Sequence, residues 1–171
     1  MNLEEIFTGA GLKGARPQEI LMSIVIPDFL KKYLTDLVEE FSDVEEIWLL
    51  GSRANNSANE NSDWDIMIFA DHYVLNALKM NVSFKHQDID LLVVYDGNKF
   101  EQPWVSLSRV GTKRTKKGEL KQWDFRETEN NVAVYSGSKP DVPDGYFINP
   151  TQMKMYRIWK DNNWISIASM L

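Results

Sequence analysis

A glycine–serine pair and two closely spaced aspartates lie at the ends of two apolar runs, and this arrangement limits the folds that the chain can adopt. The first run ends at Leu50 and leads directly into Gly51-Ser52, and the second starts at Asp63-Trp64-Asp65. Short apolar runs bounded in this way are typical of buried strands. Glycine permits a tight turn and a close approach of another group to the backbone. We therefore expect two strands, with polar residues where the first ends and the second begins.

The aspartates are spaced so that their carboxylates can converge. Side chains at positions i and i+2 of a strand point to the same face, so Asp63 and Asp65 can face one point. Asp88 and Asp90 follow the same rule at the start of a third apolar run, Ile89–Tyr95. If the strands are neighbours, three carboxylates suit a hard cation such as Mg²⁺, or two ions about 3.5–4 Å apart. A lone Asp-x-Asp is more often a solvated strand end, so the combination with the Gly-Ser turn is what indicates a site.

The turn itself has two interpretations. A helix that starts at Ser52 offers backbone N–H groups to a phosphate, and the Ser52 hydroxyl and the charge of Arg53 can assist. Serine at the start of a helix is also an ordinary N-cap. The turn indicates a phosphate-binding site only in combination with the nearby carboxylates.

The spacing of apolar residues predicts the other elements. Apolar residues three and four apart predict a helix over 28–41. We expect further helices over 52–57, 72–80 and 151–159. We expect strands over 46–50, 63–70, 89–95, 104–110, 120–128 and 132–135, and a loop over 111–118.

These elements predict an α+β fold, with a mixed β-sheet, helices packed mainly on one face, and a β-rich C-terminal extension. A chain of 171 residues is expected to be a single domain, 1–171. Within it we expect a core over 28–95 and an extension over 96–171, whose role the sequence does not show.

Composition excludes several classes of protein. The chain has no cysteine, which excludes disulfides and thiolate metal sites. It has no apolar run of 18 residues or more and no signal sequence at its start, so we expect a cytoplasmic protein without a membrane partner. The net charge of −6 argues against general affinity for nucleic acid.

The motif carries a family resemblance. The string Leu50-Gly51-Ser52-Arg53-Ala54, with Asp63-Trp64-Asp65 opening the next strand, resembles the signature of the DNA polymerase beta-like nucleotidyltransferase superfamily, in particular its minimal nucleotidyltransferases. The resemblance covers residues 28–95 and implies the core fold of that family. Its loop differs from the usual pattern, because residues 55–61 are rich in asparagine instead of Gly, Pro and basic residues.

The resemblance implies a role for each residue of the motif. It implies nucleotide binding by Gly51, Ser52 and Arg53. It implies metal binding and catalysis by Asp63, Asp65 and Asp90, with Asp88 as the alternative third carboxylate. Asp90 would ligate the metal that activates the acceptor and is the candidate to take its proton.

The implied reaction is transfer of a nucleoside monophosphate from a nucleoside triphosphate to an acceptor hydroxyl, with release of pyrophosphate. The implied cofactor is Mg²⁺, as two ions, with Mn²⁺ as a substitute. ATP is favoured only on general grounds. The acceptor stays open between a small molecule, a protein side chain and an RNA end.

Two other functions stay open. The chain could be a nucleotidyltransferase-like binding module with little or no catalysis, such as the antitoxin-type partner of another protein. The segment 109–121, which has six basic residues and one acid, could bind the triphosphate, nucleic acid or an acidic protein, or could be a solvated loop. Trp104, Trp123, Trp159 and Trp164 could stack on a base, although core packing is favoured.

Overall fold

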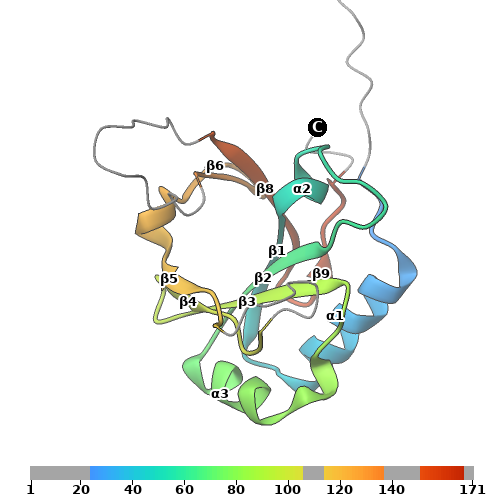
Figure 1. Ribbon diagram of the computed structural model, residues 1–171, viewed down its shortest axis with the longest axis vertical. Helices are drawn as coiled ribbons and strands as arrows, with labels where there is room; N and C mark the ends of the chain where they lie inside the picture. Colours follow the sequence, from blue (N-terminus) through green and yellow to red (C-terminus); the bar gives the residue numbers. More distant parts are fainter. Residues whose placement is uncertain (1–23, 106–113, 137–150, 168–171) are drawn as a thin grey trace, which may run out of the picture.

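One continuous mixed sheet forms the centre of the molecule (Figure 1). The structure is a computed structural model that describes residues 24–105, 114–136 and 151–167. Its strands are β1 (Val44–Leu50), β2 (Trp64–Ala70), β3 (Ile89–Tyr95), β4 (Lys99–Glu101), β5 (Lys117–Glu119), β6 (Arg126–Glu129), β7 (Val132–Tyr135), β8 (Met153–Lys160) and β9 (Asn163–Trp164). Their order is β5-β4-β3-β2-β1-β8-β7-β6, with β9 beside the end of β8. Of the pairs in this sheet, β2 and β3 are parallel and the others are antiparallel.

Helices cover the outside of the sheet. The α-helices are α1 (Asp28–Glu40), α2 (Gly51–Ala54) and α3 (His72–Met80). The 3₁₀ turn η1 (Val82–Phe84) follows α3, whereas the 3₁₀ turn η2 (Leu120–Trp123) packs inside the curl of the sheet. In Figure 1, α1 and α3 lie outside the curled sheet, and α2 lies where β1 ends. Pro27 precedes α1, where a missing N–H costs no helical hydrogen bond. None of the helices in the described ranges is long and apolar enough to cross a lipid bilayer.

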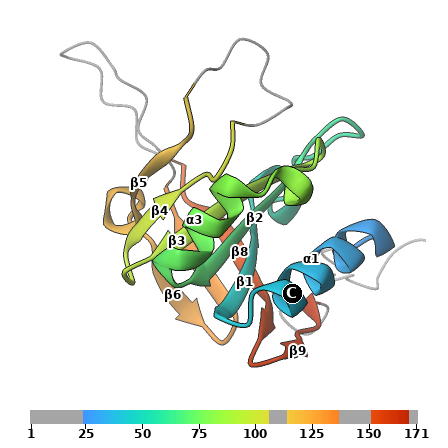
Figure 2. The same ribbon diagram turned by 90° about the horizontal axis from the view of Figure 1, so that it is seen from below.

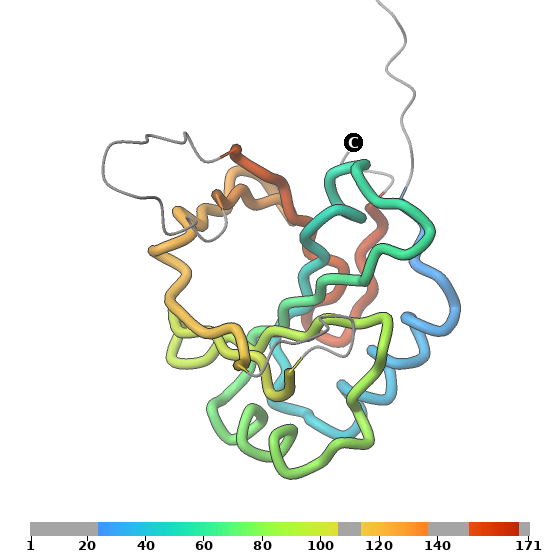
Figure 3. The backbone as a smooth tube through the Cα atoms, in the orientation of Figure 1, coloured from blue at the N-terminus to red at the C-terminus, as the bar shows by residue number. Residues whose placement is uncertain are grey.

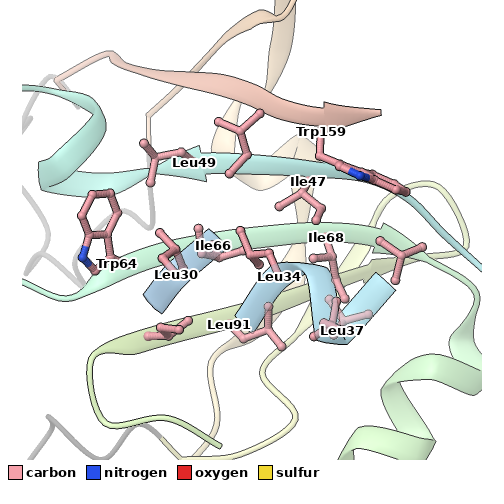
Figure 4. Close-up of a cluster of buried hydrophobic side chains, with 14 of the residues drawn as sticks. Leu30, Leu34, Leu37, Ile47, Leu49, Trp64, Ile66, Ile68, Leu91 and Trp159 are labelled. Atoms are coloured by element: carbon pink, nitrogen blue, oxygen red, sulfur yellow. The ribbon is translucent and has the colours of Figure 1, made fainter. Parts of the chain in front are cut away.

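The first core lies between α1, α3 and the sheet. The α1 residues Leu30, Leu34 and Leu37 are spaced by four and three and are fully buried. In Figure 4 they lie against apolar side chains of β1, β2 and β3. The sheet residues that are labelled there are Ile47, Leu49, Ile66, Ile68 and Leu91. Helix α1 therefore forms because one apolar stripe has a sheet face to cover.

The second core lies inside the curl of the sheet. Trp48, Met67 and Leu92 of the first three strands meet Trp123 of η2 and Tyr135 of β7 there. Figures 2 and 3 show the curl, in which η2 connects the β4–β5 end of the sheet to β6 and β7. The C-terminal extension thus closes around the inner face of the core strands.

The α+β class is confirmed, with helices mainly on one face and a β-rich extension. The helix over 28–41, the strands over 46–50, 63–70, 89–95 and 132–135, and the helix over 72–80 are present within two residues of their expected ends. Asp71 takes the N-cap position of α3, although its side chain makes no capping hydrogen bond.

Four predictions about the elements are wrong. The helix expected over 151–159 is strand β8, and the strand expected over 120–128 is η2 followed by β6. The helix expected over 52–57 ends at Ala54, and the loop expected over 111–118 contains the start of β5. The strand expected over 104–110 lies mostly outside the described residues, and Trp104 and Val105 are not in a strand.

Candidate functional site

Asp65 and Asp90 lie side by side in the sheet. Strands β2 and β3 are parallel, and their register places Asp65 directly opposite Asp90. The strands of a sheet are about 4.8 Å apart, so the two side chains start close together. Two residues further along each strand, Met67 and Leu92 enter the second core. The two carboxylates therefore belong to the inner face of the curled sheet, at the end where β2 and β3 begin.

The turn at Gly51 packs directly on Asp65. Gly51 has a φ of +73°, and a Cβ atom built on it would be 2.0 Å from Oδ2 of Asp65. Only glycine combines this backbone conformation with such a close approach. The backbone N–H of Gly51 donates a hydrogen bond of 3.0 Å to the hydroxyl of Tyr135. A core turn, a core carboxylate and a tyrosine of the extension thus meet at one point.

The Tyr135 hydroxyl stays protonated at neutral pH. Burial raises the pKa of Tyr135, and the negative charge of Asp65 raises it further, although the hydrogen bond from Gly51 acts in the opposite direction. A neutral hydroxyl beside a carboxylate and a turn can both accept and donate a hydrogen bond.

Asp90 is held by two residues of the extension. The side-chain amide of Gln102 donates to Oδ1 of Asp90, and the ammonium of Lys116 lies 3.8 Å from Oδ2. Gln102 is 2% exposed and Asp90 is 6% exposed. Gln102 and Lys116 also hold each other in place. The N–H of Lys116 donates to the side-chain oxygen of Gln102, and the N–H of Gln102 donates to the carbonyl of Lys116. The buried carboxylate of Asp90 thus has one neutral hydrogen-bond donor and one nearby cation.

Asp63 and Asp88 both line a surface hollow of about 520 Å³ at the end of the sheet. The hollow is also lined by Phe29, Arg53 and Trp64, among others. The Asp88 side chain is 55% exposed and lies 3.9 Å from the ring of His86. The structure therefore places the four acids as two pairs, with Asp90 beside Asp65.

Arg53 and Asn55 hold the chain between the turn and the aspartates. The guanidinium of Arg53 donates to the carbonyl of Ser62, at 2.6 and 3.2 Å, and lies over the ring of Trp64. The Asn55 side chain donates to the carbonyls of Gly51 and Lys154 and accepts from the backbone N–H of Lys154. This asparagine thus connects α2 to β8, and the loop is ordered by side-chain contacts.

The residues at the site suit a divalent cation in part. Asp65 and Asp90 supply hard oxygen donors side by side, and Mg²⁺ is usually held by one or two carboxylates with substrate phosphates. Within the described ranges, no three Asp, Glu, His or Cys side chains surround one point as metal ligands would. Asp65 and Asp90 thus fit one cation, and a third carboxylate stays a prediction.

Comparison with known proteins agrees with the motif. Residues 32–83 match the family model described as polymerase beta, nucleotidyltransferase. This match confirms the resemblance. At the level of the family, it indicates transfer of a nucleoside monophosphate. The matched segment contains the Gly51 turn, Asp63 and Asp65, and it ends before Asp90 and the extension.

One solved structure is also similar to the chain. It comes from Sulfolobus solfataricus, was provisionally described as a nucleotidyltransferase, and is 25% identical with a TM-score of 0.35. The alignment covers 39% of this chain and 64% of that protein. No curated protein matches the chain.

Sequence reasoning missed three residues at the site: Gln102, Lys116 and Tyr135. Lys116 belongs to the basic segment 109–121, so its charge was a signal that a phosphate or carboxylate lay near. Gln102 and Tyr135 gave no signal, because neither belongs to a motif. Tyr135 approaches the site through the curl of the sheet, and Gln102 through the pairing of β4 with β3. The four tryptophans do not form one platform, because Trp123 packs in the second core and Trp159 in the first.

Proposed function

We propose that the protein transfers a nucleoside monophosphate from a nucleoside triphosphate to an acceptor hydroxyl, with Mg²⁺ as cofactor and pyrophosphate as the leaving group. One observation supports this most, namely the pairing of Asp65 with Asp90 on adjacent strands beside the Gly51 turn. A carboxylate pair next to a half-buried backbone turn suits a metal-bound triphosphate. The match over residues 32–83 agrees with this class of reaction.

The chain's own residues would mainly hold and orient the reactants. Asp65 and Asp90 would ligate the cation, and Asp63 is the proposed third carboxylate. Gly51 and Ser52 would position the triphosphate. When bound, the cation would supply positive charge at the phosphate oxygens. Placement of this kind accounts for most catalysis of phosphoryl transfer.

The proposed chemistry forms one bond and breaks another. The acceptor oxygen bonds to the α-phosphorus, and the bond from that phosphorus to the oxygen of the β-phosphate breaks. The acceptor proton passes to a carboxylate, for which Asp90 is the proposed base. Arg53 would act indirectly, by positioning Asp63, because its guanidinium donates a hydrogen bond to the carbonyl of the preceding residue, Ser62.

One observation favours the alternative of a binding module. Both oxygens of Asp90 already contact protein groups, as in a site that serves structure. In that case the fold would present a surface to a partner protein, and nucleotide turnover would be absent.

A label-transfer experiment tests the two functions. The protein is incubated with Mg²⁺ and each nucleoside triphosphate, labelled at the α-phosphate, in the presence of small-molecule, protein or RNA acceptors. We expect label on one acceptor class, an equal amount of pyrophosphate, and a loss of about 100-fold or more in Asp65→Asn. Asp43→Asn, at an exposed acid before β1, is the matched control. Transfer that is absent for every nucleotide and acceptor class would instead support the binding module.

A further inference from the structure

Within the described part of the basic segment 109–121, Lys116 brings its positive charge to Asp90, a carboxylate that the proposed function needs. The Lys116 ammonium is 3.8 Å from Oδ2 of Asp90, and no more than a quarter of the Lys116 side chain is exposed. Lys121, in the same segment, pairs with Glu119 at the surface instead. Lys116 therefore differs from its basic neighbour in facing the site.

Burial explains why Asp90 has a cationic partner. A buried carboxylate without a counter-charge is unfavourable, and an ammonium with an additional hydrogen-bond donor offsets the lost hydration. Asp90 receives both, from Lys116 and from the amide of Gln102. The protein itself thus neutralises part of the negative charge of the site.

Lys116 is positioned by its backbone as well as by its charge. Its N–H donates to Oε1 of Gln102 at 2.6 Å, and its carbonyl accepts from the N–H of Gln102 at 2.8 Å. Directly after it, β5 pairs with β4 in antiparallel register. The start of the Lys116 side chain is therefore fixed near Asp90, while its ammonium can still move by rotation of its four side-chain bonds.

We propose that Lys116 is the resident counter-ion of Asp90 and that a divalent cation must displace it in order to bind. The inference rests on the proposed function, because it assumes that Asp90 is a metal ligand. A divalent ion on Asp90 and an ammonium in its present place would repel each other strongly at so short a distance. Lys116 therefore lowers the affinity of the site for free metal.

Displacement of the Lys116 ammonium would make the site select a metal bound to nucleotide over free metal. A metal that arrives with a triphosphate brings negative charge, which the displaced ammonium can contact, whereas a free metal ion brings none. The site would thus bind free metal weakly and accept it mainly together with nucleotide. This assigns part of the extension, residues 102 and 116, to control of metal entry.

Direct measurement of Mn²⁺ binding to the full chain tests the inference without any assay of activity. Free Mn²⁺ is followed by its electron paramagnetic resonance signal in the wild type, Lys116→Met, Lys116→Arg, Lys117→Met and Asp90→Asn. We expect Lys116→Met to bind Mn²⁺ at least about tenfold more tightly, which corresponds to about 1.4 kcal/mol. Lys116→Arg keeps the charge, and Lys117→Met removes an exposed charge from the adjacent position, so both should stay within about twofold of the wild type.

The outcomes separate this inference from the proposed function. Equal affinity in the wild type and Lys116→Met, with loss in Asp90→Asn, would overturn the role of Lys116 and leave the metal site standing. Weaker binding in Lys116→Met would also overturn it. If no variant bound Mn²⁺, the metal site itself would fail, and the inference with it. Urea unfolding of each variant shows that the folded protein is being compared.

Discussion

Gly51 lies where the proposed nucleotide turn meets a proposed metal ligand. We expect Gly51→Ala to lower the free energy of unfolding by about 2–3 kcal/mol, because the new Cβ would overlap Oδ2 of Asp65 and the positive φ disfavours alanine. Gly97 is the matched control, since its φ is +70° and nothing lies within 4 Å of a Cβ built there. Gly97→Ala should lower the free energy of unfolding by about 1 kcal/mol, because only the positive φ disfavours alanine there. Urea unfolding measures both, and equal losses would contradict the close packing at Asp65.

Tyr33 has a buried hydroxyl without a hydrogen-bond partner within the described residues. Removing that hydroxyl in Tyr33→Phe should raise the free energy of unfolding by about 1 kcal/mol at pH 7, because an unpaired buried polar group is lost. The ring contacts with Phe84 and His86 do not need the hydroxyl. Urea unfolding at neutral pH tests this, and a loss of stability would show that the hydroxyl has a partner.

The same residue predicts an effect of alkaline pH. Burial raises the pKa of Tyr33 well above its usual value of 10.0, so the folded state retains a proton that the unfolded chain releases. Ionisation of Tyr33 in the unfolded chain therefore does not reduce the free energy of unfolding below pH 10, and reduces it increasingly as the pH rises above 10. Unfolding measured from pH 8 to 11 should therefore show a smaller alkaline loss in Tyr33→Phe. A parallel decline in both proteins would contradict the burial of this group.

At the scale of elements, Arg157 of β8 connects three strands. Its guanidinium bonds to Glu46 of β1 and Glu127 of β6 and lies over the ring of Trp48, and it is almost fully buried. Burial raises the pKa of Glu46, but hydrogen bonds from Trp48 and Lys160 and the charge of Arg157 more than offset this and hold it below the usual 4.5. The interactions of ionised Glu46 therefore stabilise the fold above pH 4.5, and this stabilisation is lost as the pH falls below that value.

We expect Arg157→Met to cost about 2–3 kcal/mol of stability, because Glu46 and Glu127 would both lose the charged hydrogen bonds of a nearly buried guanidinium. Lys160→Met removes another cation from the same carboxylate, but the Lys160 side chain is 41% exposed. Its loss should cost less than about 1 kcal/mol. Urea unfolding of the two variants tests this difference, and similar costs would show that β8 is not held through Arg157.

Strand β8 also shows why its type was predicted wrongly. Met155 faces the second core, whereas Tyr156, Ile158 and Trp159 face the first. A bulge places Trp159 opposite Ile47 and Arg157 opposite Trp48, so the alternation of a simple strand is broken. The remaining spacing of three and four is the spacing of a helix. By contrast, β1, β2 and β3 each contain a continuous apolar run with Gly or Asp at one end, and their sequence predicts them well.

At the scale of the whole molecule, the site is formed by two halves of the chain. Gly51 and Asp65 could be predicted because a local motif carries them, and Asp90 because an acid pair opens the next apolar run. Gln102 and Tyr135 could not, since neither belongs to a motif. Tyr135 reaches the turn, 84 residues away in the sequence, only because the sheet curls, and Gln102 reaches Asp90 through the pairing of β4 with β3. Local patterns do not encode which distant strand will lie over a given turn.

The proposed site is tested most directly by the affinity for a non-hydrolysable nucleoside triphosphate analogue, measured with and without Mg²⁺. The proteins compared are the wild type, Asp65→Asn, Asp90→Asn and the control Asp43→Asn, each checked for folding by urea unfolding. We expect binding that depends on Mg²⁺, is weakened at least about tenfold in Asp65→Asn and Asp90→Asn, and is unchanged in Asp43→Asn. Binding that is indifferent to Mg²⁺ and equal in all four proteins would contradict a metal–nucleotide site at these carboxylates.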